Sequence, residues 1–126
     1  MTHDPRPFDD AALRSAEREL AAALGSDDPT AWVYHYTEDA VFDGGGEHAV
    51  QGRHALLEMA RSMRPLSEAS IRPLRTAGHG DLAAVWIEAS WASGGVSDRQ
   101  MVQARGILVW RRETDGRWRV AMEHIS

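Results

Sequence analysis

The sequence contains no cysteine, which excludes disulfide bonds, thiolate metal sites and thiol nucleophiles. It has no apolar run near the roughly 20 residues that a membrane-spanning helix needs. Residues 1–7 are polar, contain two prolines and lack the apolar stretch of a secretion signal. We therefore expect a cytoplasmic protein without a membrane span, and we expect residues 1–7 to form a flexible N-terminus.

An excess of positive charge is also missing. The chain has 14 basic and 19 acidic residues and a net charge of -5, which repels phosphate backbones. The C-terminal arginines flank a predicted turn and are typical of a solvated hairpin end: Arg105, Arg111, Arg112, Arg117 and Arg119. We expect no nucleic-acid partner.

The 126 residues fit one domain, which we place at residues 8–126. Three helices are predicted from apolar spacing and end signals. The first covers residues 8–24, and the second begins at Ser26-Asp27-Asp28-Pro29 and carries Trp32, Val33 and Tyr36 inward. The third runs from Gly52 to Met63.

Period-two patterns predict strands. A short strand at residues 40–43 is broken by Gly44-Gly45-Gly46, and residues 48–51 return as its partner. Longer strands follow at residues 69–77, 82–93, 99–112 and 117–125, with Asp115-Gly116 as the last hairpin turn. The expected fold is α+β, in which a curved antiparallel sheet wraps around the N-terminal helices like a cone. Such a cone encloses a cavity for a small ligand.

Alternation along the strands predicts which side chains face the cavity. In two strands one face is apolar or small, and we place it inside: Ala83, Val85, Ile87, Ala89 and Trp91; Val102, Ala104, Gly106, Leu108 and Trp110. The last strand is ambiguous, because Trp118, Val120, Met122 and His124 share one face while Ala121, Glu123 and Ile125 share the other. Parity alone leaves Glu123 either exposed or as a lone acid inside the cone.

Several segments resemble one family: Tyr36-Thr-Glu-Asp-Ala-Val-Phe42, Gly52-Arg53, Asp115-Gly116-Arg-Trp118 and Glu123-His124-Ile-Ser126. In this order they are similar to the SnoaL-like branch of the nuclear-transport-factor-2-like (cystatin-like) superfamily, which includes ketosteroid isomerases, polyketide cyclases and scytalone dehydratase. The resemblance implies a conical roll and places Glu123 and Ile125 toward the pocket. Fold alone does not fix function in such a superfamily.

By this resemblance, Asp43 falls at the position of the ketosteroid isomerase's general base. The residues of the oxyanion hole are not matched, since Glu17 or Arg18 stands where a tyrosine is needed and Leu108 where an aspartic acid is needed. We therefore do not expect steroid isomerisation by that mechanism. An inward Asp43 would lose hydration, which raises the pKa toward general-base values; the alternative is a turn-capping aspartate.

Glu123 is the second catalytic candidate and would assist Asp43 if it faces inward. Tyr36 is the third, as a hydrogen-bond donor to a ligand oxygen. If Glu123 faces inward, His124 faces outward and has a structural or interface role. The spacing of Asp43, Glu47, His48 and His54 matches no metal motif, so we expect no metal and no cofactor.

Two functions remain open. The first is a cofactor-independent isomerase, cyclase, dehydratase or hydrolase that acts on a hydrophobic, polyketide- or terpenoid-like substrate. Its expected apolar walls are Trp32, Met59, Met63, Val85, Ile87, Trp91, Leu108, Trp110 and Ile125. The second is a non-catalytic domain that binds a ligand or associates with a protein. Either function is compatible with a homodimer formed through the outer sheet face, where Trp86, Ile107, Val109 and Trp118 are expected.

Overall fold

The structure is a computed structural model that describes residues 7–44, 48–63 and 66–126. Most of the expected flexible N-terminus lies outside the described residues, as do Gly45, Gly46 and Glu47. The elements in chain order are α1 (Asp10–Leu24), α2 (Pro29–Val33), β1 (Tyr36–Asp43), β2 (Val50–Gln51), α3 (Arg53–Met63), β3 (Leu66–His79), β4 (Leu82–Ser93), β5 (Gln100–Arg112) and β6 (Trp118–Ile125). The expected α+β fold is confirmed.

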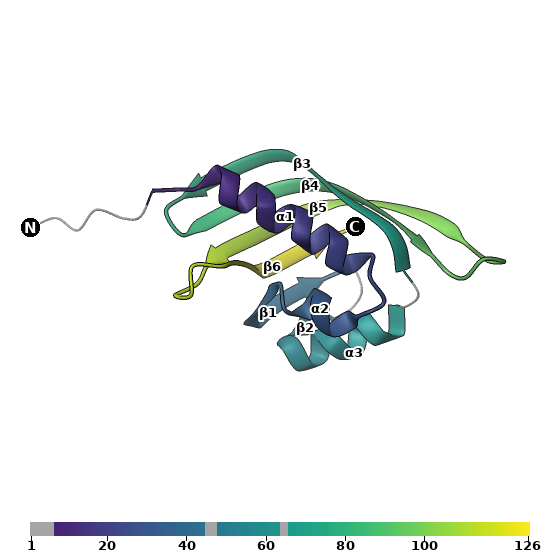
Figure 1. Cartoon of the computed structure of the whole chain (residues 1–126). Coiled ribbons are helices and arrows are strands. Elements are labelled where there is room, and N and C mark those ends of the chain that lie inside the picture. Colours follow the sequence, from purple (N-terminus) through teal and green to yellow (C-terminus); the bar gives the residue numbers. More distant parts are fainter. Residues whose placement is uncertain (1–6, 45–47, 64–65) are drawn as a thin grey trace, which may run out of the picture.

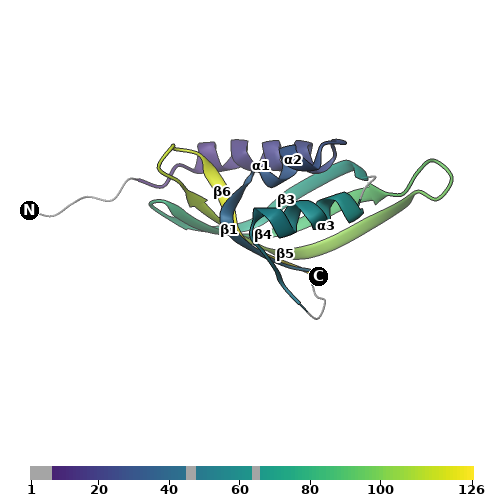
Figure 2. The same cartoon turned by 90° about the horizontal axis from the view of Figure 1, so that it is seen from below.

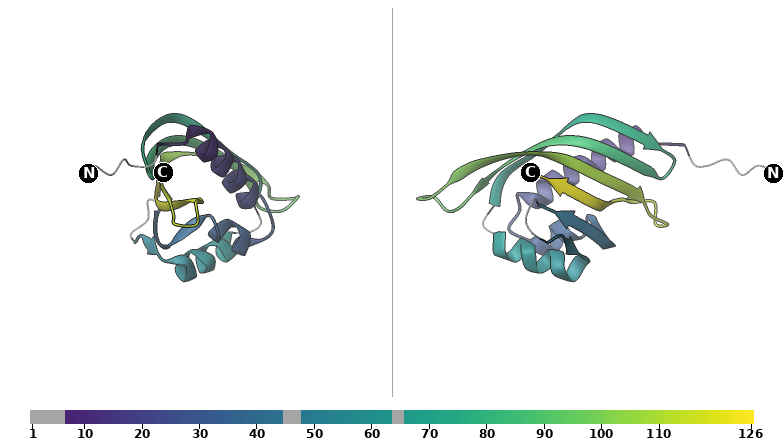
Figure 3. Two further views of the ribbon diagram at one scale, coloured as in Figure 1. Left: turned by 60° about the vertical axis from the view of Figure 1, so that its left-hand side comes forward. Right: turned by 180° about the vertical axis from the view of Figure 1, so that it is seen from behind.

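The described strands form one curved sheet in the order β2-β1-β6-β5-β4-β3. Only β1 and β6 pair in parallel, and the other neighbours are antiparallel. Helix α1 lies along the concave side of the sheet, while α2 and α3 lie together below it (Figures 1 and 2). The end view in Figure 3 shows the sheet arching over α1, with α3 on the far side of the interior. The core therefore sits between the sheet and the three helices.

Local signals set the helix starts. The Asp9 side chain accepts a hydrogen bond from the Ala12 amide at 3.0 Å, and the Asp28 side chain accepts one from the Thr30 amide at 3.0 Å. Both aspartates occupy N-cap positions, where a carboxylate satisfies an unpaired amide of the first turn. Among the described residues no helix is long and apolar enough to cross a membrane.

Tyr36 does not lie on the second helix, so that prediction is wrong. Helix α2 ends at Val33, and the His35 amide closes a turn on the Trp32 carbonyl at 3.1 Å. The Val120 amide then donates to the His35 carbonyl at 2.8 Å, which brings the chain beside β6. Tyr36 is therefore the first residue of β1, and that strand is longer than the sequence pattern predicted.

Strand β6 contains a bulge that resolves the question of its two faces. Trp110 pairs with Val120 and Val109 pairs with Met122, so one step along β5 matches two steps along β6 and Ala121 is the extra residue. Before the bulge Trp118 and Val120 are buried, and after it Glu123 is buried while Met122 and His124 are exposed. The face of Trp118 and Val120 is therefore inward in the first half of the strand, and the face of Glu123 is inward in the second half.

The inward faces predicted for β4 and β5 are largely confirmed. Six of their side chains lie buried in the core cluster: Ala83, Val85, Ile87, Ala89, Leu108 and Trp110. Gly106 has a different role from the one predicted, because a Cβ there would meet the His124 carbonyl oxygen at 2.0 Å. Its missing side chain permits the close approach of β6 rather than enlarging the cavity.

The outer face of the sheet carries exposed apolar side chains. Trp86 is 38% exposed and Met122 is 41% exposed. Trp118 was predicted to belong there, which is wrong: it is buried in the core cluster, with its ring 5.9 Å from that of Phe8 in an edge-on contact. Strand alternation before the Ala121 bulge points it inward.

Candidate functional site

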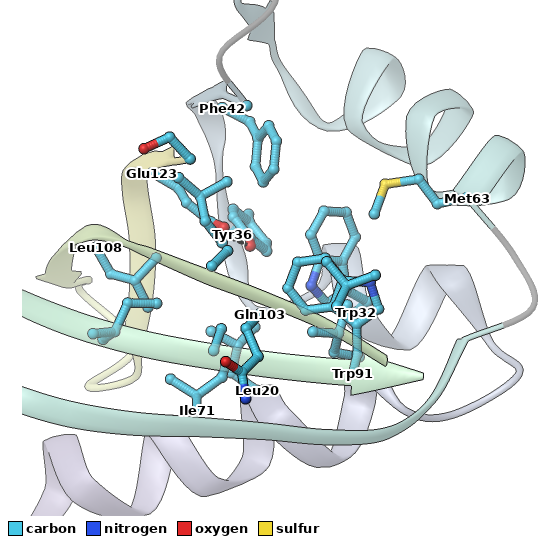
Figure 4. Close-up of a pocket in the computed structure, with 18 residues that line it drawn as sticks. Leu20, Trp32, Tyr36, Phe42, Met63, Ile71, Trp91, Gln103, Leu108 and Glu123 are labelled. Carbon is cyan, nitrogen blue, oxygen red and sulfur yellow. Dashed lines mark hydrogen bonds between the residues drawn. The ribbon is translucent and has the colours of Figure 1, made fainter. Parts of the chain in front are cut away.

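A cavity of about 350 Å³ opens at the wide end of the cone, between the sheet, α1, α2 and the end of α3 (Figure 4). Its walls are mostly apolar, and aromatic rings come from Trp32, Tyr36, Phe42 and Trp91. The remaining lining residues are Leu20, Leu24, Gly44, Met63, Ile71, Ile87, Ala89, Val102, Gln103, Ala104, Leu108, Glu123, Ile125 and Ser126. Among the described residues of this lining, Glu123 is the only acidic side chain and none is basic.

The structure sorts the predicted walls into two groups. Six line the cavity: Trp32, Met63, Ile87, Trp91, Leu108 and Ile125. The other three, Met59, Val85 and Trp110, do not line it. Val85 and Trp110 are fully buried in the core, and Met59 is partly buried against it. The side chains of these three residues therefore belong to the packed core and leave the cavity wall to other residues.

Several lining residues were missed as ligand contacts. Leu20 and Leu24 belong to the apolar stripe of α1, and Ile71 comes from β3. The sequence indicated the helical stripe but not which of its turns meets the cavity. Phe42 was also missed, although Ala40 and Phe42 share one face of β1 while Asp39 and Asp43 share the other, which is a usable signal for an inward face.

Glu123 and Tyr36 meet at one side of the cavity (Figure 4). The Tyr36 hydroxyl donates a hydrogen bond to Glu123 Oε1. The Trp32 ring packs against that of Tyr36, with the two ring centroids 4.7 Å apart.

Burial controls the acidity of this pair. It raises the pKa of Glu123 to about 7, and the hydrogen bond from Tyr36 opposes the shift because it favours the charged carboxylate. Burial also raises the pKa of Tyr36 well above its ordinary value, and the neighbouring Glu123 adds to that shift. Tyr36 therefore stays a hydroxyl donor near neutral pH, while Glu123 exchanges a proton there.

Asp43 does not share this cavity, so the prediction of a desolvated aspartate inside the cone is wrong. Phe42 points into the cavity and alternation turns Asp43 away. The Asp43 side chain is 43% exposed, and its Oδ2 lies 3.2 Å from His124 Nδ1 on the outer side of the sheet. Asp43 and Glu123 are therefore on opposite faces and do not form an acid–base pair.

His124 faces outward, as the inward position of Glu123 requires. Of the four residues considered as metal ligands, Glu47 lies outside the described residues. Within the part of the chain that the structure describes, no cluster of three or more His, Asp or Glu side chains could hold a metal ion.

Glu17 is a second buried acid, and it lies outside the cavity lining. Arg14 Nη1 is 2.7 Å from Glu17 Oε1, and Arg14 also bonds to Asp10 and to Thr76 of β3. Glu17 Oε2 is buried and has no hydrogen-bond partner among the residues that the structure describes. Burial raises the pKa of Glu17 to about 7, against the opposing charge of Arg14.

Three solved structures share the fold with this chain at low sequence identity. A ketosteroid isomerase-like protein from Erwinia carotovora atroseptica is 20% identical, with a TM-score of 0.79 over 94% of this chain and 97% of that chain. A candidate scytalone dehydratase from Novosphingobium aromaticivorans is 13% identical, with a TM-score of 0.78 over 90% and 80%. A Nostoc punctiforme protein with a cystatin-like fold is 14% identical, with a TM-score of 0.77 over 98% and 93%.

The comparison with curated proteins finds no match. The family model of the SnoaL-like domain, in contrast, matches residues 17–121, a span that runs from the buried acid of α1 to the bulge in β6. This match shows that the chain belongs to the SnoaL-like domain family.

Proposed function

We propose that the chain is a cofactor-independent isomerase or dehydratase of a hydrophobic small molecule, with Glu123 as the group that moves the proton. The observation that carries this proposal is the buried Glu123–Tyr36 pair at the wall of an otherwise apolar cavity. A carboxyl group whose pKa lies near the working pH is well suited to general acid–base catalysis.

One carboxyl group is sufficient for either reaction. In an isomerisation, the Glu123 carboxylate takes a proton from a carbon next to a carbonyl and returns it to another carbon, so that a double bond moves. In a dehydration, it takes a C–H proton and delivers it to the departing hydroxyl, which leaves as water. In both cases Glu123 ends in its starting protonation state. Tyr36 orients the carboxylate through Oε1, which leaves Oε2 for the substrate.

The family and its fold relatives support these two reaction classes. The isomerase-like and dehydratase-like proteins named above share the fold with this chain. The apolar walls of the cavity favour a hydrophobic substrate, such as a polyketide or terpenoid. The absence of basic side chains from the described lining disfavours ligands that carry a carboxylate or phosphate, because their charge would be buried unpaired.

The decisive experiment compares Glu123→Gln with Asp43→Asn in a screen of apolar enones and β-hydroxy ketones. We expect Glu123→Gln to lower turnover by about 10²–10⁴-fold. The Asp43→Asn variant, changed on the outer face, should keep turnover within about twofold, since its side chain does not reach the substrate. Loss of turnover in Asp43→Asn with full turnover in Glu123→Gln would refute the assignment.

A matched ligand series separates catalysis from simple binding. The affinities of naphthalene derivatives that carry a ketone, an alcohol or a carboxylate are compared by calorimetry. We expect the ketone and the alcohol to bind at least about tenfold more tightly than the carboxylate at pH 8, because the carboxylate would be buried beside ionised Glu123. Binding of the neutral bodies without turnover of any substrate would favour the non-catalytic ligand-binding domain instead.

We also propose that two copies associate through the outer sheet face. Trp86 and Met122 leave apolar surface there, and Arg72 and Arg105 flank Glu88 at 2.9 and 3.3 Å. A two-fold arrangement would cover the apolar side chains and let these charges pair between copies. Sedimentation should show a dimer that Trp86→Glu converts to a monomer. A monomer at high concentration for the unchanged chain would end this proposal.

A further inference from the structure

Tyr36 stands apart from the regular part of β1. It pairs with Val120 of β6, and the next paired residue is Val41, which faces Met122. Five steps along β1 therefore match two along β6, so residues 37–40 bulge out of the ladder. Strand β2 pairs only with Val41 and Phe42. The short β1–β2 pair thus cannot fix the position of Tyr36, which needs an anchor of its own.

The backbone of Tyr36 points toward α3 rather than toward β6. In a parallel pair a residue bonds to the two neighbours of the residue opposite, and the Val120 amide accordingly donates to the His35 carbonyl. The carbonyl of Tyr36 is therefore directed away from β6. No strand of the described chain stands on that side of Tyr36, because β2 ends at Gln51 where α3 begins.

Arg53 occupies the place of the missing strand. Its Nε and Nη2 donate to the Tyr36 carbonyl at 2.9 and 2.7 Å. The preceding residue holds the other end of the bulge, since the Gly52 amide donates to the Ala40 carbonyl at 2.8 Å. Gly52 has φ +88°, a backbone conformation that favours glycine and lets the chain turn from β2 into α3. The pair Gly52-Arg53 thus bridges both ends of the bulge.

The guanidinium group suits this task better than another cation. Its planar fork places two N–H groups on one carbonyl and fixes the direction as well as the distance, whereas an ammonium group acts as a point donor. The third nitrogen, Nη1, is 4.0 Å from the carboxylate of Glu38, which is almost fully exposed. Arg53 does not line the cavity, so it does not contact a ligand there.

From this geometry we propose that Arg53 is the positioning residue of the site: by holding the Tyr36 carbonyl, it aligns the Tyr36 hydroxyl with Glu123. The inference rests on the proposed role of Glu123 and adds a residue that acts through Tyr36 from outside the cavity. Without the guanidinium group, the carbonyl loses both bonds and the first residue of β1 is held only by β6 and by packing. The hydroxyl then no longer has a fixed approach to Glu123 Oε1.

The titration of Glu123 reports this alignment without any substrate. The hydrogen bond from Tyr36 lowers the pKa of Glu123 against the effect of burial. A loosened Tyr36 should therefore move the Glu123 midpoint upward, whereas a general loss of packing would let water in and move it downward toward 4.5. The direction of the shift distinguishes positioning from a merely structural role.

The experiment follows the Glu123 carboxyl carbon by NMR from pH 4 to pH 9, with Glu123→Gln to assign the signal. The variants are Arg53→Gln and Arg53→Lys, and the matched control is Glu38→Gln, which removes the exposed partner of Arg53 and leaves the carbonyl contact intact. We expect a rise of about half to one unit in Arg53→Gln, a smaller rise in Arg53→Lys and none in Glu38→Gln. Millimolar guanidinium should lower the midpoint of Arg53→Gln again.

The outcomes separate this inference from the proposed function. If the unchanged chain titrates at an ordinary glutamate value, the desolvated acid is absent and the proposed function fails. If the unchanged chain titrates near 7 and both Arg53 variants keep that midpoint, the positioning role alone is refuted. A downward shift in folded Arg53→Lys, a variant that keeps the charge and the apolar stem, also refutes it.

Discussion

The two buried acids of this molecule differ in what surrounds them. Glu123 is 7% exposed and Glu17 is 3% exposed, and burial raises the pKa of each to about 7. Glu123 borders a cavity and has a neutral partner, the Tyr36 hydroxyl. Glu17 lies outside the cavity lining, between α1 and the sheet, and has a charged partner, Arg14.

A raised pKa therefore marks a functional carboxyl group only where a ligand can also reach that group. A ligand in the cavity can reach Glu123, and the hydroxyl donor leaves its charge unneutralised. Arg14 instead neutralises Glu17 and ties α1 to Thr76 of β3. Glu17 is thus a buried ion-pair residue whose removal should affect stability and leave the reaction intact.

The largest expected effect is on stability as a function of pH. Both acids have a folded-state pKa of about 7, above the ordinary value of 4.5, so their protonated forms are the ones that the fold favours. Stability is fully present below pH 4.5 and is lost as the pH rises through 7, by up to about 3 kcal/mol for each group. Urea denaturation at pH 5 and pH 8 should show this loss.

Each substitution should remove one share of that pH dependence. Glu17→Gln and Glu123→Gln are compared with Glu58→Gln, whose carboxylate is exposed on α3. If the free energy of unfolding falls by the same amount between pH 5 and pH 8 in all three variants, neither buried acid is responsible for the loss. If only one of the two buried-acid variants loses part of this pH dependence, the two sites differ in burial more than the structure indicates.

The next effect concerns the pH dependence of the reaction. If the Glu123 carboxylate is the base, kcat/KM rises with pH to a plateau above about 7 and is about 100-fold lower at pH 5. Glu17→Gln should leave the midpoint unchanged, because Glu17 does not line the cavity. If Glu17→Gln shifts the pH midpoint of kcat/KM, the two acids are coupled and the distinction between them fails.

A smaller effect is expected from removing the cation beside Glu17. Arg14→Met should destabilise the fold by about 1–3 kcal/mol at pH 8, where Glu17 would otherwise be ionised, and by less at pH 5. The double variant with Glu17→Gln should recover much of this loss. The NMR midpoint of Glu123 serves as the internal control and should stay in place.

The smallest effect is expected from Tyr36→Phe, which deletes only the hydroxyl. The Glu123 midpoint should rise, because the bond that favours its charged form is gone. Stability at pH 5 should change by about 1 kcal/mol or less, since the protonated acid loses a single hydrogen bond. An unchanged midpoint would show that Tyr36 does not tune this acid.

The sequence predicted the long strands well, because period-two alternation and the Asp115-Gly116 turn act locally. Tyr36 was misplaced since Trp32, Val33 and Tyr36 also fit a helical spacing and no glycine or proline marks the end of α2. The Asp43–Glu123 pair failed for a different reason: the resemblance supplied a position in the chain, whereas strand alternation decides the face.

The bulge at Ala121 left no signal in the sequence. It contains neither glycine nor proline, and it depends on both neighbouring strands, since β1 and β5 each lose register at that point. Tyr36 and Glu123 are 87 residues apart in the chain. Their hydrogen bond therefore could not be predicted from either segment alone.

The Ala121 bulge also decides which side chains of the second half of β6 face the cavity. If β6 kept its length but paired with its neighbours without a bulge, Met122 and His124 would face the cavity and Glu123 would face outward. A deletion of one residue at 121 or 122 removes the bulge and still leaves Glu123 inside. In this strand a change of length is expected to preserve the chemistry of the cavity, whereas a slip without a change of length would exchange a carboxyl group for an imidazole.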